Sequence, residues 1–253
     1  MIYITGDTHG SFERRFNTGV FPEQKDMTKD DYIIICGDFG GIWDRDGESE
    51  SEKYWLDWFN DRTYTLLFID GNHENFDRIA SYPEKEWHEG RVHEIRPSVY
   101  HLMRGQVYEI DGKLIFTFGG AASHDISGGL LDLEDPDFRE KKKYLDREYE
   151  PYRIKKLTWW EQEMPSEEEM KEGIENLRKH NNEVDYIVTH CCSTSTQNAL
   201  GRKGIYSPDR ATEYLERIKN TVKYKKWFFG HYHDNVNVND KEILLYEQII
   251  RIS

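Results

Sequence analysis

Short runs of apolar and β-branched residues recur along the 253-residue chain, and polar segments of helical character separate several of them. We predict strands at residues 2–5, 32–36, 65–69, 106–110, 114–118, 184–189, 227–229 and 243–252, and helices at residues 52–60, 166–181 and 209–220. This alternation is typical of an α/β fold, and the length suffices for one such domain with a well-buried core. We therefore expect residues 1–253 to form a single α/β domain.

One stretch departs from this alternation. Residues 124–165 are dense in charged and aromatic side chains, including the run EKKK at residues 140–143 and the pair Trp159 and Trp160. The interpretation that we favour is a solvated helical insertion that its tryptophans anchor to the domain. The alternative is a lid above an active site.

Five short polar motifs each follow a predicted strand. They read Gly6-Asp7-Thr8-His9-Gly10, Gly37-Asp38-Phe39-Gly40, Gly71-Asn72-His73-Glu74, Thr189-His190 and Gly230-His231-Tyr232-His233. In open α/β sheets, ligands bind at the carboxyl ends of the strands, so these distant segments can meet there. Carboxylate, amide and imidazole groups without a thiolate are the donors of a hard-to-borderline divalent ion. The sequence therefore predicts a metal site at this edge.

Two of the motifs carry donors two residues apart, Asp7 with His9 and His231 with His233. In an extended backbone, side chains at this spacing lie on the same side. Each pair can therefore chelate one ion together or address two adjacent ions.

The order Asp-x-His, Gly-Asp, Gly-Asn-His-Glu, His, Gly-His-x-His resembles the full signature of the calcineurin-like metallophosphoesterase superfamily, over residues 6–233. The resemblance implies a four-layer α/β/β/α sandwich of two mixed β-sheets flanked by helices. It also implies that Asp7, His9, Asp38 and His233 hold one divalent metal ion. A second ion would be held by Asp38, Asn72, His190 and His231, with Asp38 bridging the two. Manganese is the ion we favour, and iron or zinc suits the same donors.

The same resemblance implies a metal-dependent phosphoric ester hydrolase. Two divalent ions against two carboxylates leave a net positive site for a phosphate. Ions ~3.5–4 Å apart can share a water, and the bridging hydroxide that results would attack phosphorus directly. Asp38 and His73 are the expected catalytic residues. His73 would protonate the leaving oxygen or stabilise the transition state, with Asp38 or another acid orienting its ring.

Two arginines of the protein-phosphatase branch are missing. That branch has Gly-Asp-x-x-Asp-Arg-Gly and Arg-Gly-Asn-His-Glu, whereas residues 37–43 read GDFGGIW here and Asp70 precedes Gly71. Protein-phosphatase activity is therefore in doubt. Arg14, Arg104 and Arg202 are candidates to replace the lost bidentate grip on phosphate, and the sequence does not choose among them.

Three functions fit the motifs. We expect a phosphatase or phosphodiesterase that acts on a small or nucleotide-like phosphate ester. The alternatives are a nuclease of the same superfamily and a non-catalytic metal-binding scaffold, although the intact motif positions disfavour the scaffold. With 34 basic and 48 acidic residues the net charge is −14, so long nucleic acid is disfavoured as a partner without being ruled out.

The cellular setting is predicted from sequence patterns that the chain lacks. The cysteines Cys36, Cys191 and Cys192 are odd in number and two are adjacent, so we expect no disulfide framework. The amino-terminal residues lack the pattern of a signal peptide, and no apolar run approaches the ~20 residues that span a bilayer. We expect a cytoplasmic protein without a membrane partner; the oligomeric state is not readable.

Other candidate residues have a simpler interpretation. We expect structural roles for the histidines outside the motifs, namely His88, His93, His101 and His180. Cys191 and Cys192 are expected to be buried beside His190 without binding metal. The segment Ser123-His124-Asp125 either contacts the site or forms an ordinary turn. Trp43 either stacks on a substrate or packs in the core, and Trp227 is expected in the core.

Overall fold

The computed structural model describes residues 1–201 and 206–253, which build two large β-sheets. The first sheet has the order β15-β1-β2-β3-β6-β5-β4. Its strands are β1 (Ile2–Thr5), β2 (Tyr32–Ile35), β3 (Thr65–Phe68), β4 (Glu84–Trp87), β5 (Gly90–Arg96), β6 (Val99–Leu102) and β15 (Ile249–Arg251). Strands β1, β2, β3 and β6 are parallel, whereas the pairs β15–β1, β6–β5 and β5–β4 are antiparallel.

The second sheet has the order β13-β14-β12-β11-β8-β7. It comprises β7 (Gln106–Ile110), β8 (Lys113–Phe118), β11 (Tyr186–Thr189), β12 (Lys226–Phe229), β13 (Val236–Asn237) and β14 (Glu242–Leu244). Strands β8, β11, β12 and β14 are parallel, and β7 and β13 pair antiparallel at the two edges. Both sheets are therefore mixed.

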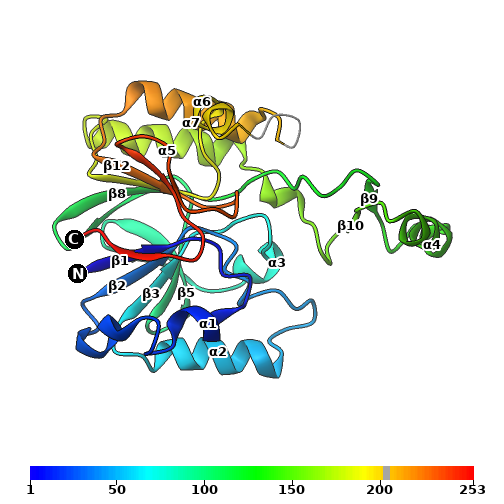
Figure 1. The fold of residues 1–253 in the computed structure, drawn as a ribbon, viewed down its shortest axis with the longest axis horizontal. Coiled ribbons are helices and arrows are strands. Elements are labelled where there is room, and N and C mark those ends of the chain that lie inside the picture. The colour runs from blue at the N-terminus through cyan, green and yellow to red at the C-terminus, as the bar shows by residue number, and fades with distance from the viewer. Residues whose placement is uncertain (202–205) are drawn as a thin grey trace.

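Helices cover the outer face of each sheet (Figure 1). Helices α1 (Phe12–Phe16) and α2 (Glu50–Asn60) lie on the first sheet, and α5 (Glu167–Lys179), α6 (Thr194–Ala199) and α7 (Arg210–Thr221) lie on the second. The short α3 (Phe76–Ile79) follows β3. The predicted four-layer sandwich of two mixed sheets flanked by helices is thus confirmed. Among the helices described, none has both the length and the apolar character that a bilayer crossing requires.

Burial on both faces explains the continuous apolar strands. In β2, Tyr32 and Ile34 pack between the two sheets, whereas Ile33 and Ile35 pack beneath α1 and α2. Alternate side chains of a strand point to opposite faces, so a strand with two covered faces needs apolar residues throughout. The second sheet repeats this arrangement, with Trp227 packed among the residues beneath α7 as expected.

One predicted strand is wrong. Residues 243–252 form two strands, β14 in the second sheet and β15 in the first. The connecting segment passes over Gly6, where a Cβ atom would lie 2.1 Å from the carbonyl oxygen of Leu245. A continuous apolar pattern does not reveal that the chain changes sheets.

The insertion forms an arm with a small core of its own. It contains α4 (Phe138–Glu148) and two short parallel strands, β9 (Leu130–Leu131) and β10 (Arg153–Ile154). In Figure 1, α4 lies well away from the sandwich. The side chains of Leu131, Leu145 and Ile154 pack together within the arm. The returning chain is anchored by Trp160, which is buried and donates from Nε1 to Asp77 over 3.1 Å.

A buried polar network lies between β3, β5 and β6. His93 Nδ1 is 2.9 Å from His101 Nδ1, His101 Nε2 is 3.1 Å from Asp70 Oδ1, and Arg104 donates from Nε to the other Asp70 oxygen over 2.9 Å. His93 and His101 therefore have partners within the fold, in agreement with the structural role expected of them. Burial, and then the neighbouring His101, lowers the pKa of His93 to about 4.

This network predicts a pH-dependent stability. Between pH 6.5 and about 4 the unfolded chain protonates His93 and the folded chain does not, so stability falls as the pH drops through that window. The contribution amounts to at most about 3 kcal/mol. Urea unfolding of the metal-free protein should show a shallower slope against pH for His93→Gln than for wild type. Equal slopes would contradict the assignment.

Candidate metal centre

All seven predicted ligands lie at the carboxyl ends of neighbouring strands. Asp7 and His9 follow β1, Asp38 follows β2, Asn72 follows β3, His190 follows β11, and His231 and His233 follow β12. The two sheets meet there through hydrogen bonds made by these residues themselves. The backbone N–H of His231 donates to both carboxylate oxygens of Asp7, over 3.0 and 3.1 Å. The motif residues therefore join the two sheets.

One group of donors consists of Asp7, His9, Asp38 and His233, and its candidate ligand atoms lie within 4.8 Å of one another. His233 Nε2 is 2.9 Å from His9 Nε2 and 3.1 Å from Asp7 Oδ2, and His9 Nε2 is 3.8 Å from Asp38 Oδ2. Neighbouring donors that bind one ion at ~2.1 Å lie roughly 3.0–3.5 Å apart. The separations of 2.9 and 3.1 Å are close to this spacing and the separation of 3.8 Å is somewhat wider, so these donors are near enough to address one divalent ion.

The other group consists of Asp38, Asn72, His190 and His231. His190 Nε2 lies 3.2 Å from Asn72 Oδ1 and 3.4 Å from Asp38 Oδ1, and the rings of His190 and His231 are 5.0 Å apart. His190 Nδ1 lies 2.8 Å from the carbonyl oxygen of Cys36, which can only accept a hydrogen bond. Nδ1 therefore carries a proton, and Nε2 is the nitrogen that would bind a metal.

Asp38 belongs to both groups. Its Oδ2 faces His9, and its Oδ1 faces His190 and accepts from the backbone N–H of His73 over 2.8 Å. Burial opposes its charge, but His190, His73 and His9 hold the pKa of its carboxyl well below its usual range. Against the effect of burial, Asp38 in turn raises the pKa of His190 to about 10. In the metal-free protein, the positive charge of protonated His190 thus compensates the negative charge of Asp38. A bound cation would take the place of that proton.

The backbone at these positions is unusual. Among the residues described, eleven other than glycine have positive φ, and four of them are His9, Asp38, His231 and His233. The left-handed conformation costs roughly 1–2 kcal/mol for an ordinary residue, and such strain gathers at functional sites. Contacts with the rest of the structure must therefore keep the backbone of these four residues in its strained conformation.

Two motif glycines make room for the ligands. A Cβ atom on Gly71 would lie 2.0 Å from Asp38 Oδ1, and one on Gly37, at φ +88°, would lie 2.3 Å from His190 Nδ1. Any other residue at either position would displace a ligand side chain. Glu74 links the loops that follow β2 and β3, because its buried Oε1 accepts a hydrogen bond from the backbone N–H of Phe39 over 2.7 Å.

His73 stands beside the first group of donors, with its ring centre 5.1 Å from that of His9. No acid orients the ring among the residues described, contrary to the expectation. Instead, Arg153 Nη2 lies 2.9 Å from His73 Nε2, and Arg153 Nη1 lies 3.4 Å from His73 Nδ1. The half-buried ring of Trp43 stacks on His73 with the centres 6.0 Å apart, so Trp43 is part of the site's wall.

The segment Ser123-His124-Asp125 reaches the site. Ser123 accepts a hydrogen bond at Oγ from Asn72 Nδ2 over 3.4 Å and donates from Oγ to Glu163 over 2.6 Å. The ring of His124 is 5.8 Å from that of His231, and Asp125 pairs with Arg153. Glu163 and Ser123 direct the amide nitrogen of Asn72 away from His190, which leaves its oxygen toward the second group. Sequence reasoning missed Glu163, because nothing in the local sequence marks it.

Two of the arginines proposed as phosphate ligands, Arg14 and Arg104, are described by the structure. Arg14 is exposed on α1, and Arg104 is buried in its network with Asp70 and Glu169. Arg202 falls outside the described residues. Arg153, which the sequence analysis did not single out, contacts His73 instead.

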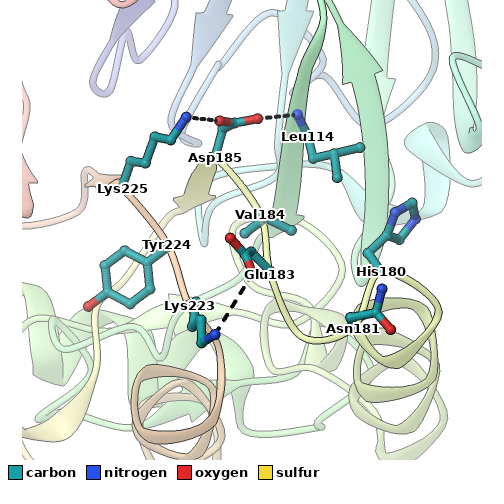
Figure 2. Close-up of a pocket in the computed structure, with 9 residues that line it drawn as sticks. All are labelled: Leu114, His180, Asn181, Glu183, Val184, Asp185, Lys223, Tyr224 and Lys225. Carbon is teal, nitrogen blue, oxygen red and sulfur yellow. Dashed lines mark hydrogen bonds and ion pairs between the residues drawn. The ribbon is translucent and has the colours of Figure 1, made fainter.

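The remaining candidates do not belong to the donor groups. Cys191 and Cys192 are buried, and neither is in the group of possible ligands. His180 lines a pocket of about 440 Å³ at the opposite ends of the strands (Figure 2). Polar groups there pair with one another, since Lys225 and the backbone N–H of Leu114 both bind the carboxylate of Asp185. Among the residues that the structure describes, the group of possible metal ligands includes none from this pocket.

The hydrogen bonds of Ser123 predict a measurable effect on metal binding. Ser123→Ala removes the group that orients Asn72 and should weaken manganese binding about 10–100-fold, the usual cost of losing an outer hydrogen-bond partner. Competition with a fluorescent chelator measures the change. The matched variant Ser127→Ala, whose hydroxyl bonds Glu150 on the arm, should bind manganese as wild type does. Equal affinities in all three proteins would contradict the role given to Ser123.

Comparison with known proteins agrees with this arrangement. A family model described as calcineurin-like phosphoesterase matches residues 1–235. The lariat debranching enzymes of Drosophila pseudoobscura pseudoobscura and Drosophila melanogaster are similar to this chain at 28% and 23% identity. Each alignment covers 92% of this chain and 42% of the relative, so the chain spans less than half the length of these curated relatives.

Among solved structures, a phosphopantetheinyl hydrolase from Mycobacterium tuberculosis aligns with 97% of this chain and 87% of that chain, at 12% identity and a TM-score of 0.41. The assignment rests on the family model, which spans nearly the whole chain and contains all five motifs. The protein therefore belongs to the calcineurin-like phosphoesterase family, as its motifs predict.

Proposed function

We propose that this chain is a metal-dependent phosphoester hydrolase that works with two adjacent divalent ions. The observation that carries the proposal is the position of Asp38, whose two oxygens face two different groups of donors. A carboxylate shared in this way suits a pair of ions, and paired ions are a recurring device for phosphoryl chemistry. Membership of a phosphoesterase family supports the same conclusion.

Seven side chains would hold the ions. Asp7, His9, Asp38 and His233 would bind one, and Asp38, Asn72, His190 and His231 would bind the other. Manganese is the ion we favour, and iron or zinc suits the same mixture of oxygen and nitrogen donors. When bound, such ions supply positive charge to a phosphate ester and lower the pKa of a water molecule beside it.

His73 would serve the leaving group. Its ring lies beside His9, outside both donor groups, and is held between Trp43 and Arg153. This position lets a ring N–H donate to an oxygen of an ester bound at the centre. Asp38 would hold the ring in place indirectly, by accepting from the backbone N–H of His73.

The surroundings favour a small or nucleotide-like ester. A pocket of about 260 Å³ opens beside His231, lined by groups that include Ser123, His124 and Asp209. Its volume lies just below the roughly 300–1,000 Å³ of most small-molecule sites, which favours a small ester. A larger groove under the arm, about 1190 Å³, is lined by five acidic and four basic residues and so lacks the basic character that a nucleic acid needs.

A second candidate is cleavage of a phosphodiester in nucleic acid. The observation that favours it is the similarity to lariat debranching enzymes. This candidate predicts oligonucleotide binding that weakens steeply with salt. Absence of binding at low salt would remove it.

The leading proposal predicts turnover of nitrophenyl phosphate esters by the manganese-loaded protein. Removal of metal with a chelator should abolish turnover, and added manganese should restore it. His73→Ala should lower kcat about 10²–10⁴-fold at unchanged metal content, the usual worth of a positioned proton donor. Asp38→Asn should lower both activity and metal content.

His180→Ala provides a control, because His180 lies at the far ends of the strands. It should keep the activity and the metal content of the wild type. A fully metal-loaded wild type that is inactive on both monoesters and diesters would contradict the proposed function.

A further inference from the structure

Arg153 is buried at the base of an otherwise exposed arm. It lies in β10 and is only 6% exposed, whereas much of the neighbouring α4 faces solvent. Its guanidinium donates to both oxygens of Asp125 over 2.8–3.1 Å and to the carbonyl oxygen of Thr158 over 3.0 Å. These contacts fix the plane of the guanidinium and direct its Nη atoms at His73.

The two contacts between Arg153 and His73 cannot both be hydrogen bonds. Both ring nitrogens of His73 face Arg153 nitrogens, at 2.9 and 3.4 Å. A neutral imidazole has one nitrogen that accepts and one that donates, and arginine only donates. One of the two contacts therefore sets a donor against a donor. A group that only accepts, such as a phosphate oxygen, would satisfy donors on both residues.

The geometry points to a phosphate at this place. Arg153 Nη2 and His73 Nε2 are 2.9 Å apart, so one oxygen can lie within hydrogen-bond distance of both. The His73 ring is beside His9 of the first donor group, so that oxygen would belong to an ester at the proposed metal centre. A planar guanidinium suits phosphate because it can donate two parallel hydrogen bonds.

We propose that Arg153, contributed by the insertion, grips the phosphoryl oxygens of the substrate and replaces the arginines that the motif positions lack. Asp125 is a positioning residue that holds the guanidinium. This inference rests on the proposed function, since it assigns a substrate contact in the same site. The arm then has two parts: α4 projects away from the sandwich, and β10 completes the active site.

Binding of inorganic phosphate tests this without turnover. Calorimetry on the manganese-loaded protein should show that Arg153→Ala raises the Kd for phosphate about 10–100-fold, the cost of losing hydrogen bonds to a charged group. Arg153→Lys keeps the charge without the fork and should fall between wild type and Arg153→Ala. Metal content, measured on the same samples, should match the wild type. The melting temperature should fall, because Asp125 and Thr158 lose their donor, but should stay above the temperature of the assay.

Arg147→Ala is the matched control, since Arg147 lies on α4 of the same arm, where it pairs with Glu148 and lies over the ring of Tyr144 at the surface. It should bind phosphate as wild type does. In turnover, Arg153→Ala should lower kcat/KM about 100-fold, a loss comparable to that of one oxyanion donor. Asp125→Asn should weaken phosphate binding less than Arg153→Ala, and should add little to it in the double variant.

Unchanged phosphate affinity in a folded, metal-loaded Arg153→Ala protein would overturn the inference, even if the wild type hydrolyses esters. An equal loss in Arg147→Ala would also overturn it, because the effect would then come from the charge of the arm. Conversely, a wild type that binds phosphate through Arg153 but hydrolyses no ester would contradict the proposed function and leave this inference standing.

Discussion

The centre of this molecule depends on one buried carboxylate. Asp38 is almost fully buried, and histidines from both sheets approach its two oxygens. A charge in such a place is costly unless positive groups compensate it. The surrounding histidines do so only if they carry protons, and cations between them would compensate Asp38 more completely. The balance of charge at Asp38 is therefore the physical reason for expecting metal.

The same residues hold the two sheets together. Asp7 of the first sheet accepts from the backbone of His231, and the ring of His190 binds the carbonyl oxygen of Cys36. Four residues of the donor groups also have a left-handed backbone conformation, namely His9, Asp38, His231 and His233. Metal binding would offset that strain, so we expect the ions to contribute to the stability of the fold as well as to chemistry.

Much of the fold and the donor set could be predicted, because the relevant signals are local. Each motif follows an apolar strand, and the carboxyl ends of parallel strands share an edge. The prediction of one strand at 243–252 was wrong because a continuous apolar run does not reveal that the chain passes from one sheet to the other. Arg153 and Glu163 were missed for a related reason. Their roles depend on the path by which the arm returns to the sandwich, and local sequence patterns do not reveal that path.

The most direct test of the account is a crystal of the manganese-loaded protein, measured at a wavelength where manganese scatters anomalously. We predict two anomalous peaks per chain, ~3.5–4 Å apart, with the Asp38 carboxylate between them. His9 and His233 should lie beside one peak, and His190 and His231 beside the other. No peak at these side chains, or a single peak that Asp38 does not touch, would contradict the central claim.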